Sequence, residues 1–76
     1  KPTASADAEA IRTLLGLTPA ETRLAVALGG GHNLVSAAAR LGIAHNTAKV
    51  QLRAIFAKTG VRRQAQLVAL LAALNG

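Results

Sequence analysis

The sequence predicts an all-α domain. Of its 76 residues, 51% are hydrophobic, and Ala and Leu dominate that fraction. Both are strong helix formers, whereas the aromatic and β-branched residues that favour strands are fewer. Capping residues and glycines divide the chain into short segments in which apolar residues recur at helical spacing. We expect four helices, with residues 1–16 forming either a linker or a further short helix.

The length and composition are those of one small domain. A chain of this size buries only about 60% of its unfolded surface, and it has no Cys for a disulfide or a thiolate metal site. The longest apolar run, Leu67 to Leu74, is much shorter than the roughly 20 residues that span a bilayer, and no signal-peptide pattern opens the chain. We expect a soluble, cytoplasmic protein with no membrane partner.

The first segment has two interpretations. From about Ala6 to Leu15 a helix would place Ile11, Leu14 and Leu15 on one face, and Gly16 would end it. A helix of about ten residues is marginal without packing, so a partly ordered linker is equally compatible with the pattern. In either case we place the start of the main domain, residues 17–76, after Gly16.

The next helix starts at Pro19. Thr18 can cap its first N–H groups, proline suits the first helical position, and Glu21 completes a capping box. The buried stripe consists of Leu24, Ala25 and Leu28. The glycines 29–31 end the helix, because glycine accepts the left-handed conformation of a helix end.

A tight turn then joins two further helices. Asn33 caps a helix of about Leu34 to Leu41, whose inner residues are Ala37, Ala38 and Leu41. Gly42 ends it, and only about three or four residues precede the next helix, which is the turn length of a helix-turn-helix. Small alanines allow the two helices to cross closely.

The helix from about His45 to Lys58 has two different sides when it is drawn at about 100° per residue. The core side consists of Ala48, Leu52, Ile55 and Thr59. The opposite side consists of Asn46, Val50, Arg53 and Ala57, with Lys49 beside it. Arg and Lys can donate to guanine O6 and N7, and a branched apolar side chain can contact the thymine methyl. We therefore predict base reading by Lys49, Val50 and Arg53.

The charge is strongly asymmetric. The net charge is +6, and all three acidic residues lie within the first 21 positions. Seven basic residues follow: Arg23, Arg40, Lys49, Arg53, Lys58, Arg62 and Arg63. A one-signed surface favours a polyanion as partner, although a solvated basic face would look the same. With one aromatic residue, Phe56, the chain lacks a stacking platform for single strands, so double-stranded DNA fits better.

The last helix, about Gln64 to Leu74, has no charged residue. Its apolar stripe consists of Leu67, Val68, Leu70, Leu71 and Leu74, and its back carries Ala65, Ala69 and Ala72. A surface helix ordinarily has a polar face. In one interpretation these alanines are simply exposed to solvent. In the other, a second copy of the chain or a further domain covers them as a second buried face.

The stretch from Leu17 to Leu74 resembles the LuxR-type (LuxR/FixJ/GerE) helix-turn-helix domain of bacterial transcription regulators. Five pieces in register carry the resemblance: Leu17-Thr18-Pro19-x-Glu21, Ala38-x-Arg40-Leu41-Gly42-Ile43, Thr47-Ala48-Lys49-Val50-x-Leu52-Arg53-x-Ile55, Lys58-x-Gly60-Val61 and Ala65-x-Leu67-Val68. The stretch from Leu17 to Leu74 covers more than three quarters of the chain.

This resemblance implies a DNA-binding output domain of a transcription regulator, preceded in the whole protein by a receiver or ligand-binding domain. The helix at 45–58 would enter the major groove, with Lys49, Val50 and Arg53 at the family's base-reading positions and Thr47 on a phosphate. The last helix would form a homodimer on DNA through Gln64, Leu67, Val68 and Leu71. RNA polymerase is a further candidate partner. Our other phosphate candidates are His45, Asn46, Lys58, Arg62, Arg63 and Arg40.

The chain departs from the family pattern mainly at helix starts. Ala44 replaces the usual Ser cap, so His45 or Asn46 would have to compensate or the cap would be weaker. Arg63 stands where a Ser normally caps the last helix. These changes leave the base-reading side untouched.

Two other functions remain open. An interaction module could dock a partner through the uncharged last helix, and a cationic peptide could lie on a membrane, although glycines and caps divide the chain into a packed fold. The histidines, His32 and His45, lack nearby Cys or acidic partners for a metal or for catalysis, and we interpret them as exposed turn residues. We expect no enzyme activity, no metal, no cofactor and no small-molecule ligand.

Overall fold

The computed structural model describes residues 4–75 and confirms the all-α fold. Its five helices are α1 (Ala4–Leu15), α2 (Pro19–Gly29), α3 (Leu34–Leu41), α4 (His45–Thr59) and α5 (Gln64–Asn75). No strand occurs in this part of the chain. The beginning of the predicted N-terminal segment, residues 1–3, and residue 76 of the predicted domain lie outside the described residues.

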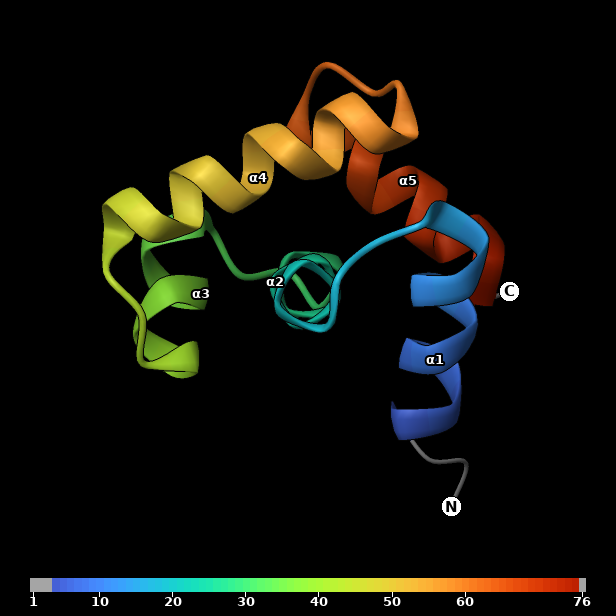
Figure 1. The fold of residues 1–76 in the computed structure, drawn as a ribbon, viewed down its shortest axis with the longest axis horizontal. Coiled ribbons are helices and arrows are strands. Elements are labelled where there is room, and N and C mark those ends of the chain that lie inside the picture. The colour runs from blue at the N-terminus through green and yellow to red at the C-terminus, as the bar shows by residue number, and fades with distance from the viewer. Residues whose placement is uncertain (1–3, 76) are drawn as a thin grey trace.

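Helix α2 occupies the centre of the molecule and contacts each of the other four helices. Figure 1 looks along α2, with α4 crossing on one side and α1 and α3 on either side of it. Its predicted stripe, Leu24, Ala25 and Leu28, is completely buried. Fully or almost fully buried side chains from the other helices meet this stripe: Ile11, Ala37, Ala38, Ala48, Ile55, Leu67 and Leu71.

The N-terminal segment is a helix where the structure describes it, not a linker. Helix α1 begins two residues before the predicted Ala6 and buries Ile11, with Leu15 packed against the core. The expectation that Leu14 faces inward is wrong, because Leu14 is 66% exposed. Helices α2 and α5 cover only the side of α1 that carries Ile11 and Leu15. The domain boundary after Gly16 stays a prediction.

The predicted capping residues set the helix starts. Glu21 N donates to Thr18 Oγ1 at 3.1 Å and Thr18 N donates to Glu21 Oε1 at 3.0 Å, which completes the capping box of α2. Asn33 Oδ1 accepts from Ser36 N at 2.8 Å at the start of α3. Among the three glycines at the end of α2, Gly29 still belongs to the helix, and Gly31 alone is left-handed, with φ of 98°.

None of the helices within residues 4–75 is long and apolar enough to cross a membrane. The same residues contain no group of three or more His, Cys, Asp or Glu side chains that could hold a metal ion.

Candidate nucleic-acid interface

The turn between α3 and α4 fixes the orientation of α4. Gly42 adopts the left-handed conformation that ends α3, with φ of 69°, and Ile43 N donates to Ala38 O at 3.0 Å. The buried side chains on the facing surfaces are small, Ala37 and Ala38 on α3 and Ala48 on α4. Helices α3 and α4 are in contact, and methyl groups of this size need little space between them.

Helix α4 has a buried and an exposed side, as the helical wheel predicts. Ala48 and Ile55 are completely buried, whereas Leu52 and Thr59 are only half-buried. All residues predicted for the opposite side are exposed: Asn46, Val50, Arg53 and Ala57. Lys49 beside them is exposed too. We call Lys49, Val50 and Arg53 the outer face of α4; their contacts with bases stay predictions.

Val50 is the unusual member of this outer face. Its side chain is 59% exposed and lies on a helix that has buried Ala48 and Ile55 on its other side. The core therefore gives no reason for a branched apolar residue at this position. A hydrophobic ligand group such as the thymine methyl would supply one.

The start of α4 has no side-chain cap. Ala44 is the N-cap residue with extended backbone, φ of −67° and ψ of 148°, and no side chain accepts a hydrogen bond from the first N–H groups. The compensation expected from His45 or Asn46 does not occur. His45, Asn46 and Thr47 are all exposed. The first turn of α4 therefore presents N–H groups without a side-chain acceptor.

Lys58 is bound within the protein. Its Nζ lies 2.7 Å from Glu21 Oε1, and the Glu21 side chain is only 10% exposed. Burial raises the pKa of Glu21, but hydrogen bonds from Lys58 and Thr18 and the charge of Lys58 outweigh it, so the pKa is lowered below its usual value. The pair joins the end of α4 to the start of α2. The sequence did not reveal it, and the phosphate contact predicted for Lys58 would have to compete with it.

Arg62 and Arg63 lie in the segment before α5 and are exposed. Their backbone N–H groups donate to Gln66 Oε1 at 2.8 and 3.2 Å. Gln66 therefore supplies half of a capping box where Arg63 replaces the usual Ser. We missed this cap, although a Gln three residues after the cap position is a recognised signal for it. Both arginine side chains remain available for phosphate.

Arg40 belongs to α3 and is not part of the outer face of α4. It is exposed and belongs to the last turn of α3. Figure 1 shows that α3 begins beside α4 and runs away from it. The structure therefore does not bring Arg40 together with the base-reading candidates.

The residues predicted for the dimer contact are divided between core and surface. Leu67 is completely buried and Leu71 is 2% exposed, because both pack into the core of their own chain. Gln64 and Val68 are half-buried. The exposed side of α5 carries Ala65, Ala69, Ala72 and Ala73 instead. A dimer through α5 stays a prediction, and a second copy would meet this alanine surface.

The two histidines differ from each other. His45 is exposed, as expected, but it is the first residue of α4 and not a turn residue. His32 is half-buried, with its Nδ1 3.4 Å from Ser36 Oγ. It is therefore packed beside the start of α3 rather than free in solvent.

The fold and the site define a small all-α domain that exposes a basic helix, and comparison with known proteins adds one relative. The sequence is 40% identical over 62 residues to a probable transcriptional regulatory protein, SgaR, of Hyphomicrobium methylovorum. The match covers 82% of the chain but spans only 29% of the length of that relative. No family model matches the chain. No solved structure matches it either.

Proposed function

We propose that this chain is a sequence-specific double-stranded DNA-binding domain of a transcription regulator. The observation that carries the proposal is the outer face of α4, where Lys49, Val50 and Arg53 are exposed together while Ala48 and Ile55 anchor the opposite side. The similarity to a probable transcriptional regulatory protein supports the regulatory role. The five motif pieces favour the LuxR-type family and hence the output domain of a bacterial regulator.

In this proposal α4 enters the major groove, which is about 12 Å wide and admits a helix. Arg53 and Lys49 donate to guanine O6 and N7, and Val50 contacts a thymine methyl. The shared exposure of the three side chains on one side of α4 supports these contacts. These contacts provide specificity, because bases differ in the donors and acceptors that they present there.

Phosphate contacts provide the remaining affinity. The uncapped first turn of α4, together with the exposed His45, Asn46 and Thr47, offers N–H groups and polar side chains to one phosphate. The positive end of the helix dipole favours an anion there. Arg62 and Arg63, exposed at the other end of α4, would contact a second phosphate.

Two copies would bind neighbouring half-sites. The domain measures 30 × 27 × 20 Å, and successive major grooves on one side of DNA are about 34 Å apart. One copy therefore fits on each half-site without overlap, and the alanine surface of α5 would provide the contact between copies. The small side chains there would allow two helices to approach closely. Within such a regulator, RNA polymerase is a further partner that we propose.

The test selects binding sites from a random duplex library and compares Arg53→Ala with the original chain. The variant should bind the selected site about 1 to 3 kcal/mol more weakly and lose the base preference at one position. Arg12→Ala is the matched control, because it removes the same charge from α1, where Arg12 pairs with Glu9. An equal loss of affinity for selected and random DNA would show that Arg53 does not read a base.

A salt titration separates DNA binding from an interaction module. Binding to random duplex DNA should weaken steeply with salt, because each phosphate that is neutralised releases about 0.9 of a counterion. A chain that only docks a protein through α5 would bind random duplex little at any salt concentration. In that case the basic residues of α4 would be incidental.

A further inference from the structure

A second basic surface lies away from α4. Residues of α1, α2 and α3 enclose an open groove of about 480 Å³. Its lining includes Arg23, Val26 and Ala27 of α2, His32 of the following turn, and Arg40 and Leu41 of α3. We call this surface the α2–α3 groove. No residue of α4 lines it, and Figure 1 shows α4 crossing on one side of α2 while α1 and α3 flank α2.

The α2 part of the groove is a stripe of which only Ala27 packs against the core. Arg23, Val26, Ala27 and Gly30 are spaced three, four and seven residues apart, so they follow one side of the helix. Leu24 and Leu28, which are completely buried, face the core. Val26 is 38% exposed. Packing of α2 therefore explains neither the arginine nor the exposed valine.

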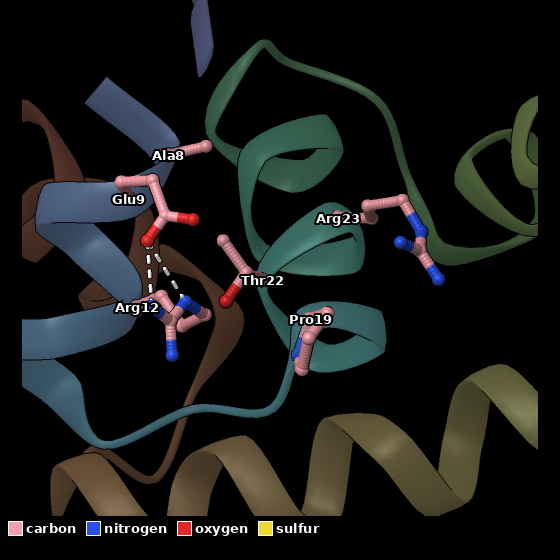
Figure 2. A pocket seen from close by; sticks show the side chains of 6 residues that line it. All are labelled: Ala8, Glu9, Arg12, Pro19, Thr22 and Arg23. Atoms are coloured by element: carbon pink, nitrogen blue, oxygen red, sulfur yellow. Dashed lines mark hydrogen bonds and ion pairs between the residues drawn. The ribbon is translucent and has the colours of Figure 1, made fainter. Parts of the chain in front are cut away.

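The two arginines of the groove have no acidic partner among the described side chains. Glu9 is bound by Arg12, whose Nη2 lies 2.6 Å from Glu9 Oε1, and Glu21 is bound by Lys58. Figure 2 shows Glu9 and Arg12 directed toward each other on α1, while the Arg23 side chain points away from both. Arg23 and Arg40, both exposed, therefore add two positive charges to one groove.

The groove combines these charges with apolar contact area. Val26 is exposed, and Ala27 and Leu41, which line the groove with the arginines, are half-buried. Guanidinium groups bind carboxylates with two parallel hydrogen bonds, and apolar side chains gain from covering the valine and leucine. A ligand that fits both the arginines and the apolar side chains of the groove carries carboxylates and apolar groups together.

We propose that the α2–α3 groove docks an acidic segment of another protein, one that presents Asp or Glu beside Leu, Ile or Phe. DNA phosphates fit the arginines but have no apolar group for Val26 and Leu41. The outer face of α4, where a duplex would lie, also contributes no residue to the groove. The domain can therefore hold DNA on one surface and a protein segment on the other. This inference does not depend on the proposed DNA binding.

The test selects ligands for the folded chain from a displayed library of random twelve-residue peptides. The selected sequences should combine Asp or Glu with large apolar residues. Backbone amide NMR with the best peptide should then show shifts at Arg23, Val26, Arg40 and Leu41, and little change on the outer face of α4. A selection without such peptides, or shifts centred on α4, would overturn the proposal.

Variants separate the groove from general attraction between opposite charges. The double substitution Arg23→Ala and Arg40→Ala should weaken the peptide at least tenfold, and Val26→Ser about threefold. Arg53→Ala, which removes a charge from α4, should leave peptide binding unchanged. All these side chains are exposed, so circular dichroism should show the same helix content for each variant.

The salt dependence of binding to random duplex DNA provides the last part of the test. The Arg23→Ala and Arg40→Ala variant should retain the salt dependence of duplex binding, because neither arginine contacts phosphate in this proposal. If the salt slope falls and the peptide still binds as before, the groove is a phosphate surface and the proposal is wrong. Failure of DNA binding in the original chain with peptide binding intact would affect only the proposed function.

Discussion

Helices α2 and α4 begin with different chemistry, although both starts follow a short turn. At the start of α2, the Thr18 and Glu21 side chains bond each other's backbone N–H groups. Glu21 also accepts from Lys58 at 2.7 Å, so two hydrogen bonds converge on one carboxylate with little exposure. At the start of α4, Ala44 offers no side-chain acceptor.

The two helix starts contribute to different properties of the protein: the α2 start to its stability and the α4 start to binding. At the α2 start Thr18 and Pro19 are exposed, but the Glu21 side chain is buried, where an unpaired carboxylate would be costly. The α4 start is open to solvent, with His45, Asn46 and Thr47 exposed, so water or a ligand can bond its N–H groups. The contacts at the α2 start stabilise the fold, whereas the N–H groups at the α4 start remain accessible to a partner.

The largest effect should come from removing the carboxylate at the α2 start. Glu21→Ala removes half of the capping box and leaves Lys58 without its partner, so the free energy of unfolding should fall by about 2 to 3 kcal/mol. Urea unfolding followed by circular dichroism measures the change.

Glu9→Ala is the matched control for that variant, because Glu9 pairs with Arg12 on the exposed side of α1. An exposed pair of this kind contributes less than about 0.5 kcal/mol. Equal losses for the two variants would mean that the Glu21 contacts do not stabilise the fold.

A smaller effect should appear as a pH dependence. The pKa of Glu21 is lower in the folded protein than its usual value of 4.5, which applies to the unfolded chain. A lowered folded pKa contributes stability above the unfolded pKa, and this contribution is lost as pH falls through the folded pKa. The free energy of unfolding should therefore decrease on acidification below about pH 5.

Glu21→Gln should remove that part of the acid sensitivity, because the amide does not titrate in this range. The comparison is between unfolding curves of the two proteins at about pH 6 and about pH 3. If both lose the same stability on acidification, other groups cause the loss and the Lys58 contact does not lower the pKa.

The sequence predicted most local features because they depend on residues close together in the chain. The capping box, the bounds of α3 and the two sides of α4 all follow from spacings of three or four residues. The left-handed Gly42 follows from the same local rules. These features include the outer face of α4, and so the candidate site was mostly predictable.

Contacts between distant segments were not predictable in the same way. Glu21 and Lys58 are 37 positions apart, and only the crossing of α2 and α4 brings them together. Leu14 follows the same helical spacing as Ile11, but no neighbouring helix covers it. The family resemblance implied a dimer contact at Leu67 and Leu71, whereas the core of the same chain buries them.

The smallest effect should come from giving α4 the cap that it lacks. Ala44→Ser places a hydroxyl at the N-cap position, where backbone φ and ψ are already extended. The free energy of unfolding should rise by about 1 kcal/mol, because the hydroxyl accepts from a first-turn N–H group. Thermal or urea unfolding of the free domain measures the gain.

Ala57→Ser controls for the change in residue type, since Ala57 is exposed on the same helix but away from its start. At position 57 serine should lower the free energy of unfolding by about 0.5 kcal/mol at most, because its helix propensity is lower than that of alanine. If Ala44→Ser raises the free energy of unfolding and Ala57→Ser lowers it, the position of the hydroxyl, and not its polarity, stabilises α4. If Ala44→Ser does not raise the free energy of unfolding, water already bonds the first-turn N–H groups of α4 as well as a side chain can. The starts of α2 and α4 then differ only in their exposure.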